Sequence, residues 1–123
     1  MVTRFELDTK VDILGSEWRI CVTTEKEEPR LASCDGFTDK TSRFIAVDDV
    51  PVESTLDQPI EFIRKIIRHE IIHAFMFESG LAENWKHDDF GQEELTIDWF
   101  AIQFHKIHEA TNRVYAALRE VKT

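Results

Sequence analysis

The sequence predicts an α+β fold, in which a small antiparallel sheet precedes a buried long helix and one or two C-terminal helices. Apolar and polar residues alternate through the first third of the chain, a period of two that is typical of strands with one buried face. Apolar side chains recur at helical spacing in two later segments, residues 58–79 and residues from about 92 to 120. No stretch rich in Pro, Gly or Ser divides the chain, so residues 1–123 are expected to form a single domain.

Two pairs of strands are expected before the first helix. Every second residue on either side of Gly15-Ser16 is apolar, at Val11, Ile13, Trp18, Ile20 and Val22. This alternation predicts a hairpin with Gly15-Ser16 as its two-residue turn. Residues 31–37 and 43–47 flank the turn-like residues 38–41 and predict a second pair of strands.

The central helix is expected over residues 58–79. Asp57 can cap its start, and Pro59 suits its first turn because the missing N–H has no partner there. Gly80 is a suitable residue to end it. Apolar residues spread around most of this helix rather than along one stripe, which predicts a helix buried on nearly all sides.

The final helix is expected over residues 92–120, either continuous or broken near residues 108–112. Four apolar residues recur on it at helical spacing and are expected to pack against the central helix as part of the core: Ile97, Phe100, Phe104 and Ile107.

The central helix carries the motif with the clearest chemistry, His69-Glu70-Ile71-Ile72-His73. The two histidines are four residues apart and so lie on one helix face, where both imidazoles can reach one metal ion. Glu70 lies beside the first histidine, where a carboxylate can take a proton from a metal-bound water. Polar groups in a buried helix are costly unless they are paired or bound to a metal, which also favours a metal site.

A catalytic zinc ion usually has three protein ligands, so a third residue is needed. Glu94 and Asp98 are four residues apart on the next helix and share one of its faces. Glu94 is the favoured third ligand, and Asp98 can accept a hydrogen bond from a ligating histidine. Two other residues stay open as the third ligand. One is Glu93, although the residue four positions after it is Ile97 rather than an acid, and the other is His87, in a polar loop.

With H-E-x-x-H on one helix and E-x-x-x-D on the next, residues 61–104 resemble the glutamate-zincin branch of the zincin metallopeptidases. The resemblance implies a minimal zincin-like domain and a hydrolase, specifically a zinc-dependent endopeptidase. The size of the chain resembles compact zincin-like domains that occur as stand-alone intracellular proteins in bacteria and their phages. Some of those relatives cut a specific repressor, which implies a narrow protein substrate.

Carried over to this sequence, the resemblance implies that His69, His73 and Glu94 hold Zn²⁺. It implies Glu70 as the general base and Asp98 as the carboxylate that fixes the orientation of a ligating histidine.

Two features of a zincin site are left open by the sequence. Many zincins have a Tyr or His that donates a hydrogen bond to the developing oxyanion, and Tyr115 and His87 are both candidates. Zincin-like folds also place an edge strand above the site helix, where an extended peptide adds by main-chain pairing. Residues 43–47, the last strand before the helix, are expected to be that edge.

Composition excludes some partners. The 24 acidic and 15 basic side chains give a formal net charge of −9, which disfavours binding to nucleic acid. No segment resembles a signal peptide or a membrane span, so a cytoplasmic location without membrane contact is expected. Cys21 and Cys34 lack metal-ligand spacing and are expected to be free thiols that are packed in the interior, although a bridge between them stays open.

Two other functions remain alternatives to the peptidase. One is a catalytically silent zincin-fold module that binds a protein partner and regulates it. The other is zinc-dependent hydrolysis of a substrate that is not a peptide, which the same ligands would support. A pure binding module has no need of a general base, and for that reason Glu70 favours the enzyme.

Overall fold

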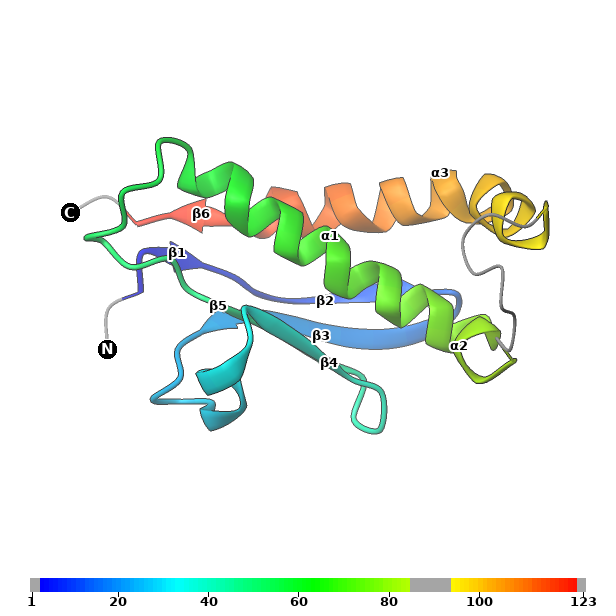
Figure 1. Cartoon of the computed structure of the whole chain (residues 1–123), viewed down its shortest axis with the longest axis horizontal. Coiled ribbons are helices and arrows are strands. Elements are labelled where there is room, and N and C mark those ends of the chain that lie inside the picture. Colours follow the sequence, from blue (N-terminus) through cyan, green and yellow to red (C-terminus); the bar gives the residue numbers. More distant parts are fainter. Residues whose placement is uncertain (1–2, 85–93, 122–123) are drawn as a thin grey trace.

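The structure, a computed structural model, describes residues 3–84 and 94–121. A four-stranded sheet carries two long helices on one face (Figure 1), which confirms the predicted α+β class. Within these residues, none of the helices combines the length and the apolar character needed to cross a bilayer.

The elements follow one another in a strands-first order that matches the prediction. They are β1 (Phe5–Glu6), β2 (Asp8–Ile13), β3 (Ser16–Thr23), the 3₁₀ helix η1 (Pro29–Ser33), β4 (Gly36–Asp39), β5 (Phe44–Asp48), α1 (Pro59–Glu78), α2 (Leu81–Asn84), α3 (Glu94–Ala117) and β6 (Arg119–Glu120). The main sheet has the strand order β2-β3-β5-β4, and β1 pairs separately with β6.

The predicted first hairpin is confirmed, but its turn lies one residue earlier than expected. Leu14 and Gly15 form the turn, with φ angles of 50° and 93°. Ser16 already belongs to β3 and pairs with Ile13. A two-residue turn with positive φ at both positions matches the right-handed twist of the strands. The expectation of Gly15-Ser16 is wrong because Leu14 takes a left-handed conformation that is unusual for leucine.

A second antiparallel pair of strands is present, but β4 shares only residues 36–37 with the expected strand over 31–37 and includes residues 38 and 39 of the expected turn. The predicted antiparallel sheet is wrong as well, since β5 runs parallel to β3. Residues 29–33, part of which was expected to be strand, form η1 instead. The long connection through η1 leaves one strand position open between β3 and β4, and β5 fills it. The edge strand is therefore β4, and the expectation that residues 43–47 form the edge is wrong.

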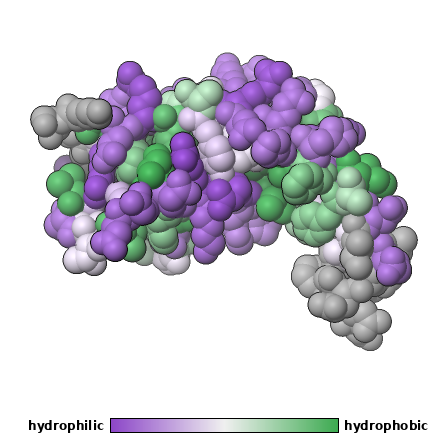
Figure 2. Space-filling model, turned by 90° about the horizontal axis from the view of Figure 1, so that it is seen from above, coloured by the Kyte–Doolittle hydropathy of each residue, from purple (hydrophilic) through white to green (hydrophobic). Residues whose placement is uncertain are grey.

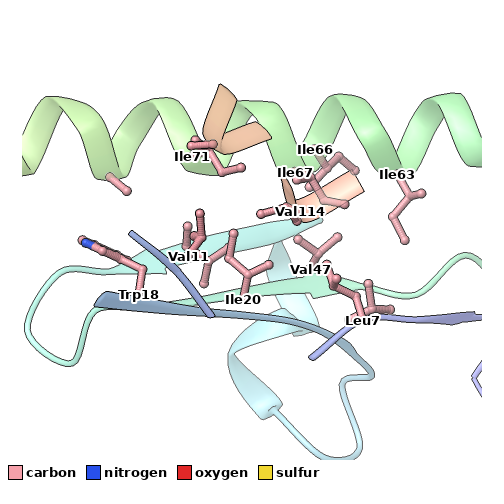
Figure 3. Packing of buried hydrophobic residues seen from close by; sticks show 14 of the residues in the cluster. Leu7, Val11, Trp18, Ile20, Val47, Ile63, Ile66, Ile67, Ile71 and Val114 are labelled. Carbon is pink, nitrogen blue, oxygen red and sulfur yellow. The ribbon is translucent and has the colours of Figure 1, made fainter. Parts of the chain in front are cut away.

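The main core lies between the sheet and the two long helices. Helix α1 packs over β4 and β5, and α3 packs over β2 and beside α1. Figure 3 shows isoleucine side chains of α1 directed at apolar side chains of the sheet; among those labelled are Ile63, Ile66, Ile67 and Ile71 on the helix and Val11, Trp18, Ile20 and Val47 on the sheet.

The opposite face of the sheet has a small core of its own under η1. Leu31 packs there against Cys21 and Ala46, with Phe37 and Phe44 at its margin. Both cysteines are free thiols, as expected. Cys21 is buried, but Cys34 is exposed, so the expectation that both are packed is wrong for Cys34.

Helix α1 begins and ends close to the predicted residues, but the residue that caps its start differs from the prediction. Gln58 is the N-cap residue and makes no side-chain capping hydrogen bond, so the expected cap by Asp57 is wrong. Pro59 is at the start of the helix as expected. Ser79 ends the helix, and Gly80 follows with a φ of 81°, the left-handed conformation that glycine adopts at low cost.

The expectation that the helix of the H-E-x-x-H motif is buried on nearly all sides is wrong. Its buried side chains, Glu70 among them, lie on the face that meets the sheet and α3. His69, His73 and Phe62 are exposed, because nothing within the described residues packs over that side of α1.

The final helix α3 is continuous, without the alternative break near residues 108–112, and it ends before the short strand β6. Ile107 packs against the core as expected, but Phe100 and Phe104 are 38% and 69% exposed. The side chain of Ile97 lies outside the described part. The helix is rotated relative to the expectation, so that its buried face carries Trp99, Ala110 and Val114.

Candidate metal centre

His69 and His73 lie on successive turns of the exposed face of α1, because α-helical geometry superimposes residues four apart. Their Nε2 atoms are 3.2 Å apart, and their ring centroids are 4.9 Å apart. Two nitrogens bound tetrahedrally to one zinc ion at about 2.0–2.1 Å lie about 3.3 Å from each other. At this spacing the two rings are hydrogen-bonded to each other in the structure, and the same spacing fits a pair of zinc ligands.

Glu70 is buried between α1 and the edge strand β4, with only 6% of the residue exposed. The Thr38 hydroxyl lies 2.9 Å from Glu70 Oε1, to which it donates, and 3.2 Å from the Glu70 carbonyl oxygen. The other carboxylate oxygen, Oε2, is 4.0 Å from His69 Nε2. The contact with Thr38 thus fixes one oxygen of Glu70 and leaves the other next to the histidine pair.

Gly36 allows β4 to approach α1 at this point. A Cβ atom on Gly36 would lie 3.0 Å from Ile66 Cγ2 and 3.4 Å from Glu70 Cγ. It would also lie 3.1 Å from the carbonyl oxygen of Ala46. Sequence reasoning missed both Gly36 and Thr38, although a glycine inside a strand is a signal of close backbone approach.

A depression of about 240 Å³ borders the site, between β4 and the end of α1. Glu70 and His73 line it together with Thr38, Lys40, Phe77 and Ala82. Lys40 Nζ lies 2.6 Å from Glu83 Oε1 on α2, so this ion pair links the turn after β4 to α2 at the margin of the depression. The depression therefore brings Glu70 and His73 to one open surface.

The structure brings His69, Glu70 and His73 together but does not bring Glu94 or Asp98 to them. Glu94 is the first residue of α3 and Asp98 follows one turn later, both with exposed side chains. Among residues 3–84 and 94–121, no three His, Cys, Asp or Glu side chains are grouped so that they could hold a metal ion. His87 and Glu93, the alternative third ligands, lie outside the described residues.

Tyr115, one of the two candidate oxyanion donors, contacts the other side of α1. Its hydroxyl accepts a hydrogen bond from Arg68 Nη1 at 2.8 Å and donates one to the carbonyl oxygen of Arg64 at 3.2 Å. The Arg64 guanidinium also lies 5.3 Å from the centre of the Tyr115 ring. Tyr115 therefore holds α3 against α1, and its hydroxyl hydrogen is already engaged.

Comparisons of this chain with protein-family models, with curated proteins and with solved structures give no significant match. A proposal about function therefore has to start from the geometry of His69, Glu70 and His73.

Proposed function

We propose that this chain is a zinc-dependent endopeptidase of the glutamate-zincin type. The observation that carries the proposal is the 3.2 Å spacing of His69 Nε2 and His73 Nε2 beside the buried carboxylate of Glu70. The proposed substrate is an intracellular protein, as for the compact zincin-like domains that the sequence resembles.

The donor set suits zinc, since two imidazoles and one carboxylate are typical ligands of a catalytic zinc ion. His69 and His73 would hold the ion. Glu94 is the third ligand that the resemblance implies, and its side chain, which the structure does not group with the two histidines, would have to move to reach the ion. Asp98 is the proposed hydrogen-bond acceptor for a ligating histidine. When bound, zinc supplies a Lewis acid and a water molecule of lowered pKa.

Glu70 is the proposed general base. Thr38 holds Oε1 at 2.9 Å, so Oε2 is the oxygen that accepts a proton from the attacking water. The same oxygen then delivers this proton to the amine nitrogen that leaves. Burial of Glu70 supports this role, because a buried and hydrogen-bonded carboxylate keeps one orientation between the two transfers.

The edge strand β4 is the proposed place for the peptide chain. It lies at the end of the strand order β2-β3-β5-β4 and packs against α1, which carries Glu70. An extended peptide can add to an exposed edge by main-chain hydrogen bonds. A side chain of the substrate would then lie in the depression that Thr38, Phe77 and Ala82 line.

The variant Glu70→Gln tests the proposal, because an amide keeps the shape of the carboxylate but cannot accept the proton. We expect zinc binding, measured by titration calorimetry, to be unchanged. We expect cleavage of proteins in an extract of the source cells, measured by mass spectrometry of new chain ends, to fall about 100- to 10,000-fold. Glu61→Gln, at an exposed position of the same helix, is the matched control and should leave both readouts unchanged.

The second candidate function is a catalytically silent zincin-fold module that binds a protein partner. The exposed side chain of Glu94, which is not grouped with the histidines, favours it. The variant Glu70→Gln also distinguishes the two functions, because they predict different results for it. A Glu70→Gln variant that binds zinc and supports the same cellular behaviour as the parent chain would contradict the peptidase and support the module.

A further inference from the structure

A second, larger cavity lies away from the candidate metal centre, between the β2–β3 hairpin and α3. Its volume is about 500 Å³, within the range of pockets that bind small organic molecules. Its base consists of apolar side chains from three elements, Val11 of β2, Phe75 of α1 and Ala110 of α3, which are 4%, 1% and 5% exposed. An apolar base supplied by three packed elements is a preformed surface for an apolar group.

The margin of the cavity carries more bases than acids, in contrast to the chain as a whole. Lys10, Lys106 and Arg113 line it together with Asp12 and Glu109, whereas the full sequence has 24 acids and 15 bases. Both acidic side chains already accept hydrogen bonds from this chain. Glu109 accepts from Arg113 Nη2 at 3.1 Å, and Asp12 Oδ2 accepts from a backbone N–H of the hairpin turn at 3.2 Å.

Lys106 is the base with the most freedom to bind an anion. Lys10 forms an ion pair of 3.3 Å with Glu17, and Arg113 is paired with Glu109. Within the part of the chain that the structure describes, the ammonium group of Lys106 has no hydrogen bond or ion pair. A lysine beside an apolar cavity can pair with the acidic end of a molecule whose apolar part fills that cavity.

Leu14 adds an independent observation at the margin of the same cavity. Its φ of 50° is a conformation that Asn, Asp or Gly adopts at lower cost in such a turn. Its side chain is 36% exposed and lines the cavity. An apolar residue kept in an unfavourable backbone conformation at a cavity is a reason to suspect a binding role.

We propose that this cavity binds a small organic anion with an apolar body, such as an aliphatic or aromatic carboxylate. The apolar body lies against Val11, Phe75 and Ala110, and Leu14 covers it from the hairpin turn. The acidic group pairs with Lys106, with Arg113 as the nearest second cation on the same helix.

The proposal is independent of the proposed peptidase. The residues that line the cavity include none that line the depression beside Glu70. The two sites also lie at opposite edges of the sheet, at β2 and at β4. The variant Glu70→Gln should therefore bind the anion as the parent chain does.

The probe for the test is 8-anilinonaphthalene-1-sulfonate, an aromatic anion whose fluorescence rises in an apolar site, with sodium decanoate as competitor. We expect saturable binding to the folded full chain and displacement by decanoate. Lys106→Glu should weaken binding at least tenfold. The matched control is Lys65→Glu, which makes the same charge change at an exposed position of α1 away from the cavity and should bind as the parent does.

The variant Leu14→Asn separates a binding role from a structural one. Asparagine tolerates positive φ, so the melting temperature should rise, while affinity for the probe should fall because the apolar cover is lost. A higher melting temperature with unchanged affinity would contradict the role of Leu14 in the proposal.

The main rival site is the exposed apolar surface of α3, formed by Phe100, Ile102 and Phe104. In Figure 2 apolar surface gathers at the end of the molecule where α3 begins. Loss of probe binding in Phe104→Ser, with parent-like binding in Lys106→Glu, would assign the probe to that surface and overturn the proposal. Absence of saturable binding to the parent chain would overturn it as well.

Discussion

Thr38 is the residue that decides how Glu70 presents its carboxylate. Glu70 is buried. The hydroxyl of Thr38 donates a hydrogen bond of 2.9 Å to its Oε1 atom. Without that hydrogen bond the buried oxygen would lose its donor, and the carboxylate would be free to turn. Thr38 is therefore a positioning residue rather than a catalytic one.

Replacing Thr38 by valine should lower the rate of cleavage about 10- to 100-fold, as the loss of outer hydrogen bonds does in metal sites. Valine matches threonine in shape but has no hydroxyl. Zinc affinity should stay within about twofold, since Thr38 is not a proposed ligand. Steady-state kinetics and titration calorimetry measure the two quantities.

Thr38→Ser is the matched control, because it restores the hydroxyl and should keep a rate close to that of the parent. Equal rates in Thr38→Val and the parent chain would show that the hydrogen bond to Glu70 plays no part in the reaction.

At the scale of elements, the contact between β4 and α1 determines the position of the site. Thr38 can reach Glu70 only because the strand approaches the helix closely at Gly36, two residues earlier. The side chain of Ile66, one turn before Glu70 on α1, fills the space that a larger residue at position 36 would need.

Gly36→Ala should destabilise the fold by about 1–3 kcal/mol, the usual cost of overpacking. The added Cβ would lie 3.0 Å from Ile66 Cγ2 on α1 and 3.1 Å from the carbonyl oxygen of Ala46 on β5, so these neighbours must each shift by a few tenths of an ångström. Urea unfolding measures the loss of stability. The movement should also lower the cleavage rate, because it separates Thr38 from Glu70.

Gly15→Ala provides the contrast. Gly15 has a φ of 93° and open space around it, so alanine there costs about 1–2 kcal/mol through backbone strain alone. We expect comparable destabilisation with unchanged cleavage by the folded protein. Equal catalytic loss in both variants would argue that the close approach at Gly36 has no special relation to the site.

At the scale of the whole molecule, the carboxylate of Glu78 joins parts of the chain that are far apart in sequence. This last residue of α1 accepts hydrogen bonds from Ser16 Oγ at 3.0 Å and Trp18 Nε1 at 3.0 Å, both on β3. It also accepts one from Arg43 Nε at 2.6 Å, in the turn between β4 and β5. At the other end of the molecule β1 pairs with β6, which joins the first and the last described segments of the chain (Figure 1).

Glu78 should make part of the stability depend on pH. Burial by itself raises the pKa of Glu78, but the hydrogen bonds from Arg43, Trp18 and Ser16 outweigh it and hold the pKa below its usual value of 4.5. A lowered pKa in the folded state means that the stabilisation is present above about pH 4.5 and is lost as the pH falls through the folded value.

Glu78→Gln should therefore be less stable than the parent chain at pH 7, and the difference should shrink as the pH falls below 4.5. Urea unfolding at a series of pH values measures this difference. Glu53→Gln, at an exposed position, is the control and should leave the pH dependence unchanged. A difference between Glu78→Gln and the parent that is constant from pH 7 to pH 3 would contradict the linkage.

The sequence by itself determined the features that depend on neighbours along the chain. Alternation at period two predicts the first hairpin, and helical spacing predicts α1 and α3. The spacing of His69 and His73 determines that they lie on one face, since both are carried by the same helix. These features are local, and local geometry sets them before any segment meets another.

Only the tertiary structure decided which segments meet. The insertion of β5 between β3 and β4, the identity of the edge strand and the exposed face of α1 all depend on burial between segments far apart in sequence. The contact of Thr38 with Glu70 spans 32 residues and follows from that strand order. Patterns of period two or 3.6 state which face of an element is apolar, but they do not state which other element covers it.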